Sequence, residues 1–138
     1  MLCSPKRSNL LSSSEIHLLT EVGFVAAGRG DVMHAERIFG ALQRLRPQRA
    51  FAPIGLSVAY MNAGRHDEAA GILAHAAAQV EPAEQAELGA FRGLALQLAG
   101  RSSESVRALK SAGENHLAHT MLGLCAAESA ETICKGSS

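Results

Sequence analysis

Histidine and cysteine side chains are the groups of this chain best able to bind a metal ion or to act as nucleophiles. His116 and His119 are three residues apart, and Cys125 follows six residues later. Zinc sites usually have four ligands, and the sequence contains neither a Cys-x-x-Cys pair nor a His-Glu-x-x-His helix. Nothing around Cys125 indicates an activated thiol. We therefore predict no metal site, no catalytic residue and no cofactor, and we expect the protein not to be an enzyme.

The segment Gly28-Arg29-Gly30-Asp31 contains the only closely spaced glycines that could suggest a phosphate-binding loop. The sequence lacks the Gly-x-x-x-x-Gly-Lys-Ser/Thr pattern that such a loop needs, and it also lacks the Gly-x-Ser-x-Gly pattern of serine hydrolases. A lengthened turn between two helices explains the segment better.

Charge and hydropathy argue against nucleic acid and the membrane as partners. The formal net charge is zero and the isoelectric point is near 7.0, so the chain has no long-range field that would attract nucleic acid. No apolar run approaches the roughly 20 residues of a membrane helix. No apolar segment typical of a signal peptide follows the first residues, so we expect a cytoplasmic protein.

A repeated tripeptide indicates how the chain is organised. Ala-Gly-Arg occurs three times, and its glycines are Gly28, Gly64 and Gly100, which are 36 residues apart in both intervals. A fixed period between 20 and 50 residues is typical of stacked repeat proteins. A small residue follows each glycine within a few positions: Ala35, Ala69 and Ser105.

Helical spacing of apolar residues between these glycines predicts an all-α domain of three antiparallel helix pairs. Ser12 and Glu15 form a capping box at the start of the first helix, and Asp31 and Asp67 are expected to cap the second and fourth. The predicted helices cover approximately residues 13–28, 32–45, 51–63, 68–80, 83–99 and 103–112. A seventh helix, near residues 115–130, is expected to cap the open end of the stack.

The expected domain covers residues 12–131. Residues 1–11 and 132–138 are predicted to be flexible tails, because both segments are polar and lack helical periodicity.

The second repeat resembles a tetratricopeptide repeat most closely. Ser57, Tyr60, Gly64, Ala69 and Leu73 fall at the consensus positions of that helix-turn-helix unit. The first unit has two extra residues in its turn, and the third is degenerate. This resemblance implies a tetratricopeptide-like array, in which the first helix of each pair lines a concave face.

A second resemblance covers about residues 16–75 and concerns function. The run from Leu18 to Val22, followed by Gly28 and by Ala35-Glu36-x-Ile38, is similar to the opening of small type III secretion chaperones. The resemblance implies a binding protein that holds an amphipathic helix of a secreted needle subunit, together with a small helical co-chaperone. The alternative is a generic tetratricopeptide scaffold or adaptor.

The concave face of such an array is predicted to be an apolar groove, with Val58 at its centre. Its positions are obtained by counting back from each Ala-Gly-Arg glycine. The predicted groove consists of Leu18, Val22, Val25, Phe51, Ile54, Val58, Met61, Asn62, Ala90, Leu94 and Leu98. An open apolar groove is a docking surface for an amphipathic helix. The same stripe could instead be ordinary core, covered by the seventh helix or by self-association.

Overall fold

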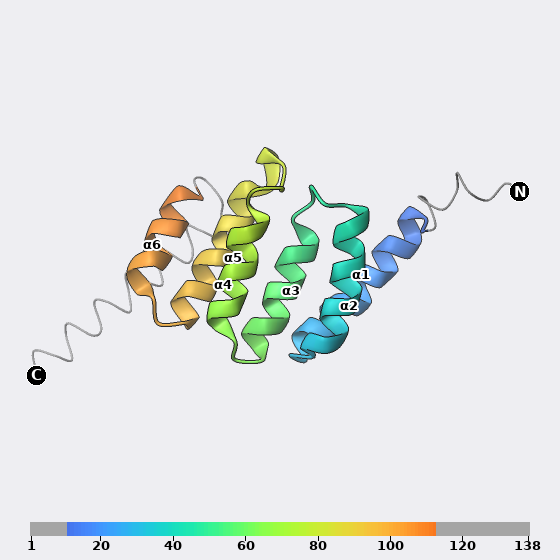
Figure 1. Ribbon diagram of the computed structural model, residues 1–138, viewed down its shortest axis with the longest axis horizontal. Helices are drawn as coiled ribbons and strands as arrows, with labels where there is room; N and C mark the ends of the chain where they lie inside the picture. The colour runs from blue at the N-terminus through green and yellow to red at the C-terminus, as the bar shows by residue number, and fades with distance from the viewer. Residues whose placement is uncertain (1–10, 113–138) are drawn as a thin grey trace, which may run out of the picture.

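The computed structural model of this protein describes residues 11–112, and every regular element in that range is helical. Figure 1 shows the helices side by side in chain order. They are α1 (Ser13–Gly28), α2 (Val32–Leu45), α3 (Phe51–Asn62), α4 (His66–Ala76), the short 3-10 helix η2 (Pro82–Glu84), α5 (Gln85–Leu98) and α6 (Ser102–Ser111). The predicted all-α class is confirmed. The predicted helix near 115–130, most of the first tail and the tail 132–138 lie outside the described residues.

The first helix starts where its capping residues predict. The backbone N–H of Ser12 donates to Glu15 Oε2 at 2.8 Å, and the backbone N–H of Glu15 donates to Ser12 Oγ at 3.2 Å. This reciprocal capping box satisfies two backbone donors that the helix itself leaves free. Asp31 caps α2 in a similar way, because its Oδ1 accepts from the backbone N–H of His34 at 3.2 Å.

The predicted cap of α4 is wrong. The helix begins at His66, one residue before Asp67, and no side chain caps it. Asp67 lies in the first turn and accepts a hydrogen bond from Arg101 Nη1 at 3.0 Å. A carboxylate in the first turn is favourable there because it faces the positive end of the helix dipole.

Three glycines with positive φ close the turns within the helix pairs. The φ angles are 70° at Gly30, 81° at Gly64 and 80° at Gly100. In each turn the residue after the glycine donates its backbone N–H to a carbonyl five residues earlier, at 2.8 to 3.0 Å. This is the Schellman arrangement, and it favours glycine because a Cβ is strained at positive φ.

The register taken from the tripeptide repeat is therefore corrected in the first pair. Gly28 is the last residue of α1, and Gly30 makes the turn. The structural intervals are 34 residues from Gly30 to Gly64 and 36 residues from Gly64 to Gly100.

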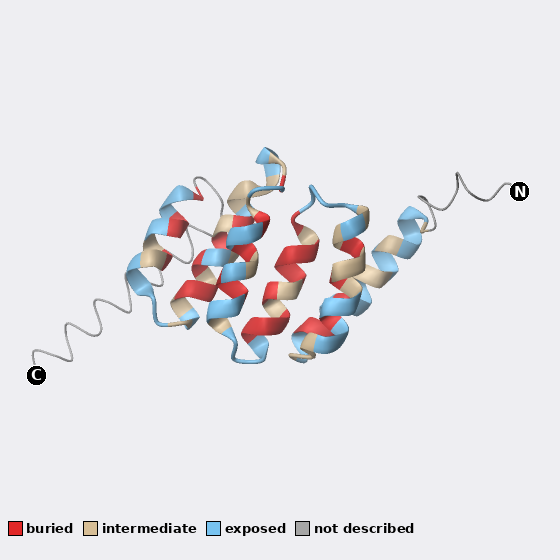
Figure 2. Cartoon of the chain, in the orientation of Figure 1, coloured by how far each residue is buried: buried red, intermediate tan, exposed pale blue. Residues whose placement is uncertain are grey.

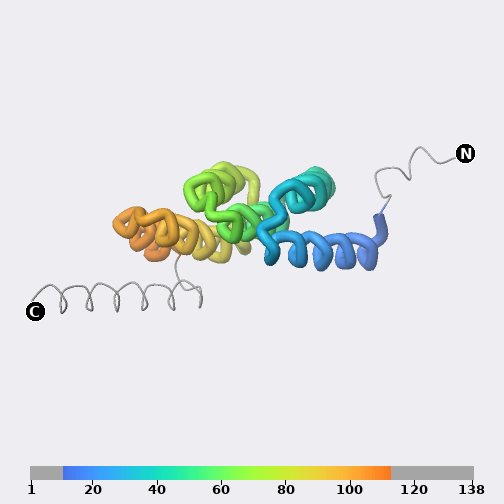
Figure 3. The backbone as a smooth tube through the Cα atoms, turned by 90° about the horizontal axis from the view of Figure 1, so that it is seen from below, coloured from blue at the N-terminus to red at the C-terminus, as the bar shows by residue number. Residues whose placement is uncertain are grey.

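The helices form two layers. α1, α3 and α5 contact one another in that order, and each helix also contacts the next one along the chain. Figure 3 shows α2 and α4 together on the other side of this row. Within the described helices, α3 contacts α1, α2, α4 and α5, whereas α1 contacts only α2 and α3.

Small residues allow the two layers to approach closely. The ring of Phe39 on α2 lies over Gly55 of α3 and Gly23 of α1, and a Cβ built on Gly23 would be 2.8 Å from Phe39 Cζ. A Cβ on Gly55 would come still closer to that ring. Leu109 of α6 covers Gly93 of α5 in the same manner. Each contact lets a large side chain fill a space that a methyl group would close.

The core repeats with the turns. Ala35, Ala69 and Ser105 follow the three turn glycines by five residues, and all are fully buried. Figure 2 shows that buried residues follow the helix sides that face their neighbours. The residues nine positions after each turn glycine, Phe39, Leu73 and Leu109, are also fully buried.

The connections between pairs are tied to each other at one edge of the stack. The backbone N–H of Glu81 donates to Gln48 O at 2.9 Å. Glu84 accepts from Arg49 Nε at 2.8 Å and from the backbone N–H of Ala50 at 3.3 Å. The start of α3 is thus held by a carboxylate that lies 34 residues away in the chain.

Candidate partner-binding surface

Four residues of the predicted groove are exposed apolar side chains. The exposed fractions are 60% for Leu18, 48% for Val22 and 56% for Val25, all on α1, and 49% for Leu98 on α5. Large apolar side chains with this exposure can bury further surface in a complex.

The groove positions on α3 are far less accessible. Ile54 and Met61 are buried, and Ile54 belongs to the same cluster of core residues as Leu73 and Leu88. Phe51 and Val58 are half-buried. Val58 packs against all three clusters that make up the core, so it lies where they meet.

The remaining predicted positions are divided between packing and hydrogen bonding. Ala90 is buried, and Leu94 is half-buried against the cluster that contains Leu96. The side chain of Asn62 donates from Nδ2 to Ala27 O at 2.8 Å, which ties the end of α3 to the end of α1. The predicted groove thus brings together exposed, half-buried and buried side chains, and the role of each in binding stays a prediction.

Two exposed apolar residues were missed by the sequence analysis. Phe24 is 38% exposed, and its ring meets that of Phe39 edge-on, with 5.1 Å between the centroids. Counted from Gly30, Phe24 is equivalent to Val58. The sequence does indicate this register. Gly30 precedes Ala35 by five residues, and the same interval separates Gly64 from Ala69 and Gly100 from Ser105. The second missed residue, Met33, is 56% exposed at the start of α2.

A polar cluster links α2, α3 and α4. The Tyr60 hydroxyl donates to Glu36, and the Arg65 guanidinium lies 4.4 Å from the centre of the Tyr60 ring. Arg65 also pairs with Glu68 at 2.6 Å. The hydrogen bond to Glu36, followed by burial, raises the pKa of Tyr60 above its usual value of 10.0. All four side chains have partners, so the cluster holds helices together and offers no free catalytic group.

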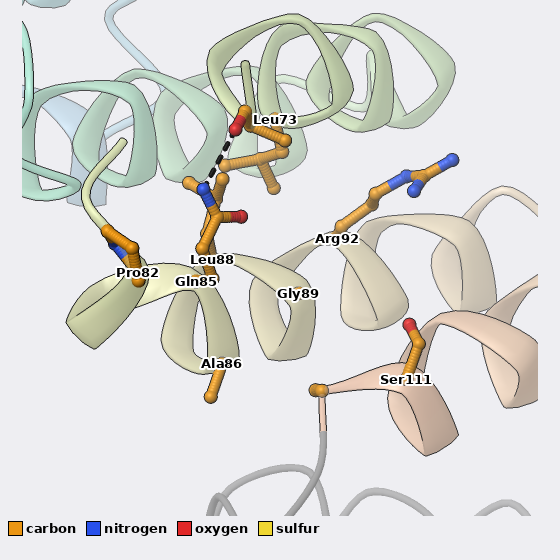
Figure 4. Close-up of a pocket in the computed structure, with 10 residues that line it drawn as sticks. Leu73, Pro82, Gln85, Ala86, Leu88, Gly89, Arg92 and Ser111 are labelled. Atoms are coloured by element: carbon orange, nitrogen blue, oxygen red, sulfur yellow. Dashed lines mark hydrogen bonds between the residues drawn. The ribbon is translucent and has the colours of Figure 1, made fainter. Parts of the chain in front are cut away.

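A pocket of about 360 Å³ lies between α4, η2, α5 and the end of α6 (Figure 4). Leu73 and Leu88 contribute apolar surface, and Arg92 is the only charged side chain among the lining residues between positions 11 and 112. Gln85 also lines the pocket, but its Nε2 already donates to Ala77 O at 2.8 Å and to Val80 O at 2.7 Å. The lining residues that the structure describes include no carboxylate, histidine or cysteine.

Between residues 11 and 112, no three His, Cys, Asp or Glu side chains gather in a group that could hold a metal ion. His116, His119 and Cys125 lie outside that range. None of the described helices is both long enough and apolar enough to cross a membrane.

Comparison of the chain with protein-family models and with curated proteins finds no match to either. Its function is therefore inferred from its own residues.

Proposed function

We propose that this chain is a cytoplasmic chaperone of tetratricopeptide type. It holds an amphipathic helix of a type III secretion substrate, such as a needle subunit, in an apolar concave groove, together with a small helical co-chaperone. It binds and releases this partner without catalysing a reaction. The observation that carries the proposal is the exposure of large apolar side chains at groove positions predicted from the Ala-Gly-Arg repeat. Leu98 lies on α5, and Leu18, Val22 and Val25 lie on α1, where the turn at Gly30 shifts the register by two residues.

The geometry of the turns supports the repeat type. Gly30, Gly64 and Gly100 share one backbone conformation, and a fully buried small residue follows each at the same distance. The interval from Gly30 to Gly64 is 34 residues, which is the length of a tetratricopeptide repeat. The adjacency of α1, α3 and α5 in one layer also fits an array whose first helices share a face.

The physical logic is mass action. A subunit that polymerises through an amphipathic helix stays monomeric while that helix is buried in another protein. Because these leucine and valine side chains are already about half buried, covering the rest of each one would contribute about 1 kcal/mol.

The test is co-expression with the needle subunit of the same organism, followed by gel filtration and measurement of the soluble fraction of the subunit. We expect a soluble complex, and loss of subunit solubility when the chain is omitted. Leu98→Asp should weaken the complex at least tenfold, because it places an unpaired charge in a desolvated contact. Met33→Asp is the control, since Met33 is similarly exposed but lies on α2, in the other layer.

Two results would count against the chaperone. A subunit that stays soluble without the chain does not need it, and a stable complex with no effect on solubility favours an adaptor. Equal binding by the wild type and Leu98→Asp would exclude the groove position on α5.

A further inference from the structure

One face of α1 and its C-cap residue carry five exposed residues at the spacing of a coiled-coil seam. Their positions differ by three, four, three and four residues, so they follow one side of the helix for two heptads. These residues, which we call the α1 stripe, are Glu15, Leu18, Val22, Val25 and Arg29. The centre of the stripe is apolar, and each end carries a charge.

The α1 stripe flanks the packed side of the helix. The buried residues of α1 are Gly23, Ala26 and Ala27, and Ala26 lies one helical turn after Val22, so the stripe borders the face that packs against α2 and α3. α1 contacts only α2 and α3 among the described helices. An apolar stripe on a helix normally packs against another element, so a second helix could bury this one.

The charges at the two ends of the stripe decide which orientation of a second, identical stripe is favourable. Glu15 and Arg29 each lie seven residues from Val22, which is about 10.5 Å along the helix axis at 1.5 Å per residue. When two copies cross antiparallel at Val22, Glu15 of each copy lies level with Arg29 of the other. When they run parallel, like charges meet at both ends.

We propose that the occupant of the α1 stripe is a second copy of this chain, bound antiparallel about a twofold axis near Val22. The contact is self-complementary, as a twofold interface requires, because each copy contributes the same apolar centre and both charges. It uses Leu18, Val22 and Val25, which the proposed chaperone function assigns to the groove, so a second copy and a substrate helix would exclude each other on α1. A single pair of short helices buries less than the roughly 1,200 Å² at the lower end of stable interfaces, so the dimer should be weak and reversible.

Sedimentation velocity of the full chain without any partner, over a range of concentrations, tests the dimer directly. We expect a monomer at low concentration and a dimer at high concentration. Val22→Glu should raise the dissociation constant at least tenfold, because two carboxylates would meet at the twofold axis. Leu98→Glu is the matched control, since Leu98 is 49% exposed and Val22 is 48% exposed. Melting curves of both variants check that each remains folded.

Two further variants test the antiparallel orientation. Arg29→Glu should weaken the dimer, because it places two carboxylates at each end, whereas Arg29→Gln, which removes only the attraction, should weaken it less. In a chain whose native cysteines are replaced by serine, Val22→Cys should form a disulfide-linked dimer under mild oxidation, whereas Leu98→Cys should not.

The proposal is overturned if the chain stays monomeric at every concentration, or if its dimer tolerates Val22→Glu as well as Leu98→Glu. A monomer that binds a helical co-chaperone through Val22 would assign the α1 stripe to that partner instead. Strengthening of the dimer by Arg29→Glu would exclude the antiparallel arrangement.

Discussion

α1 and α3 occupy equivalent places in successive helix pairs, yet they present their apolar residues to different surroundings. α3 contains no charged residue. Among the described helices, α3 has four neighbours, whereas α1 has only two neighbours. Val58 on α3 therefore lies between three core clusters, whereas the equivalent residue of α1, Phe24, is 38% exposed, and Val22 on the same helix is 48% exposed. The sequence pattern defines which residues share a helix face, but the position of the helix in the stack decides whether that face is covered.

The largest effect that separates the two helices is expected from a buried charge. Val58→Asp should destabilise the protein by about 3 kcal/mol, because the carboxylate would enter a packed, half-buried site without a cationic partner. Val22→Asp should change the unfolding free energy by no more than about 0.5 kcal/mol, since its side chain remains in water. Chemical denaturation of both variants, at a concentration low enough to keep the chain monomeric, measures the difference.

Ala69→Asp is the control for a fully buried site and should be at least as destabilising as Val58→Asp. Should Val58→Asp prove as stable as the wild type, Val58 would belong to an open groove. The contrast between α3 and α1 would then disappear.

A smaller effect on stability is expected from the turns that follow α1 and α3, because both turns contain a glycine with positive φ. Gly30→Ala should destabilise by about 1–2 kcal/mol, since φ is 70° at this position and a Cβ would lie 3.2 Å from the backbone of Asn62. Gly28→Ala should be neutral or stabilising by about 0.5 kcal/mol, because Gly28 is helical and a Cβ there meets nothing. Thermal melts of the two variants decide which glycine makes the turn.

Gly64→Ala distinguishes backbone strain at positive φ from steric contact of the added Cβ. The φ angle at Gly64 is 81°, but a Cβ there has open space around it. It should therefore cost about 1 kcal/mol, less than Gly30→Ala. A larger loss from Gly28→Ala than from Gly30→Ala would restore the register of the tripeptide repeat.

The sequence was sufficient to predict the helices and most of their ends. Ser12 and Glu15 cap α1 as their spacing indicates, and the breaks at Gly64 and Gly100 are confirmed. These features depend on neighbours within a few residues, so local spacing determines them. The Ala-Gly-Arg repeat misled the register in the first pair, because Gly28 and Gly30 are both available and only the backbone conformation distinguishes them.

Burial at the candidate surface could not be predicted in the same way. Ile54 and Leu18 are both apolar residues on a helix, but Ile54 is buried in a cluster with residues of α4 and α5 and Leu18 is 60% exposed. The close fit of Phe39 over Gly23 and Gly55 is equally non-local, since it joins three helices. Such contacts follow from how the helices stack, which helical periodicity does not encode.

The starts of α1 and α3 differ in a way that pH can detect. Residues of its own first turn cap α1, whereas the backbone N–H of Ala50, at the start of α3, donates to the distant Glu84 carboxylate. Burial acts to raise the pKa of Glu84. Hydrogen bonds with Glu81, the Ala50 N–H and Arg49 outweigh burial and hold that pKa below its ordinary value of 4.5. The pKa of Glu81 is raised above 4.5, chiefly by its hydrogen bond to Glu84 and then by burial.

The smallest predicted effect follows from these two opposite shifts. Because the pKa of Glu84 is lowered on folding, its contribution is complete above pH 4.5 and is lost as the pH falls through the folded pKa. Glu84→Gln should therefore lower the free energy of unfolding by about 1 kcal/mol at pH 7, and this loss should become smaller below pH 4.5.

Glu81 behaves in the opposite sense, since its raised pKa favours folding below pH 4.5 and this contribution is lost as the pH rises. Glu81→Gln should thus leave the melting temperature at pH 7 unchanged or higher. Denaturation of the wild type and both variants between pH 3 and pH 7 measures each difference. A constant cost of Glu84→Gln across that range would show that the carboxylate does not stabilise the start of α3 through its charge.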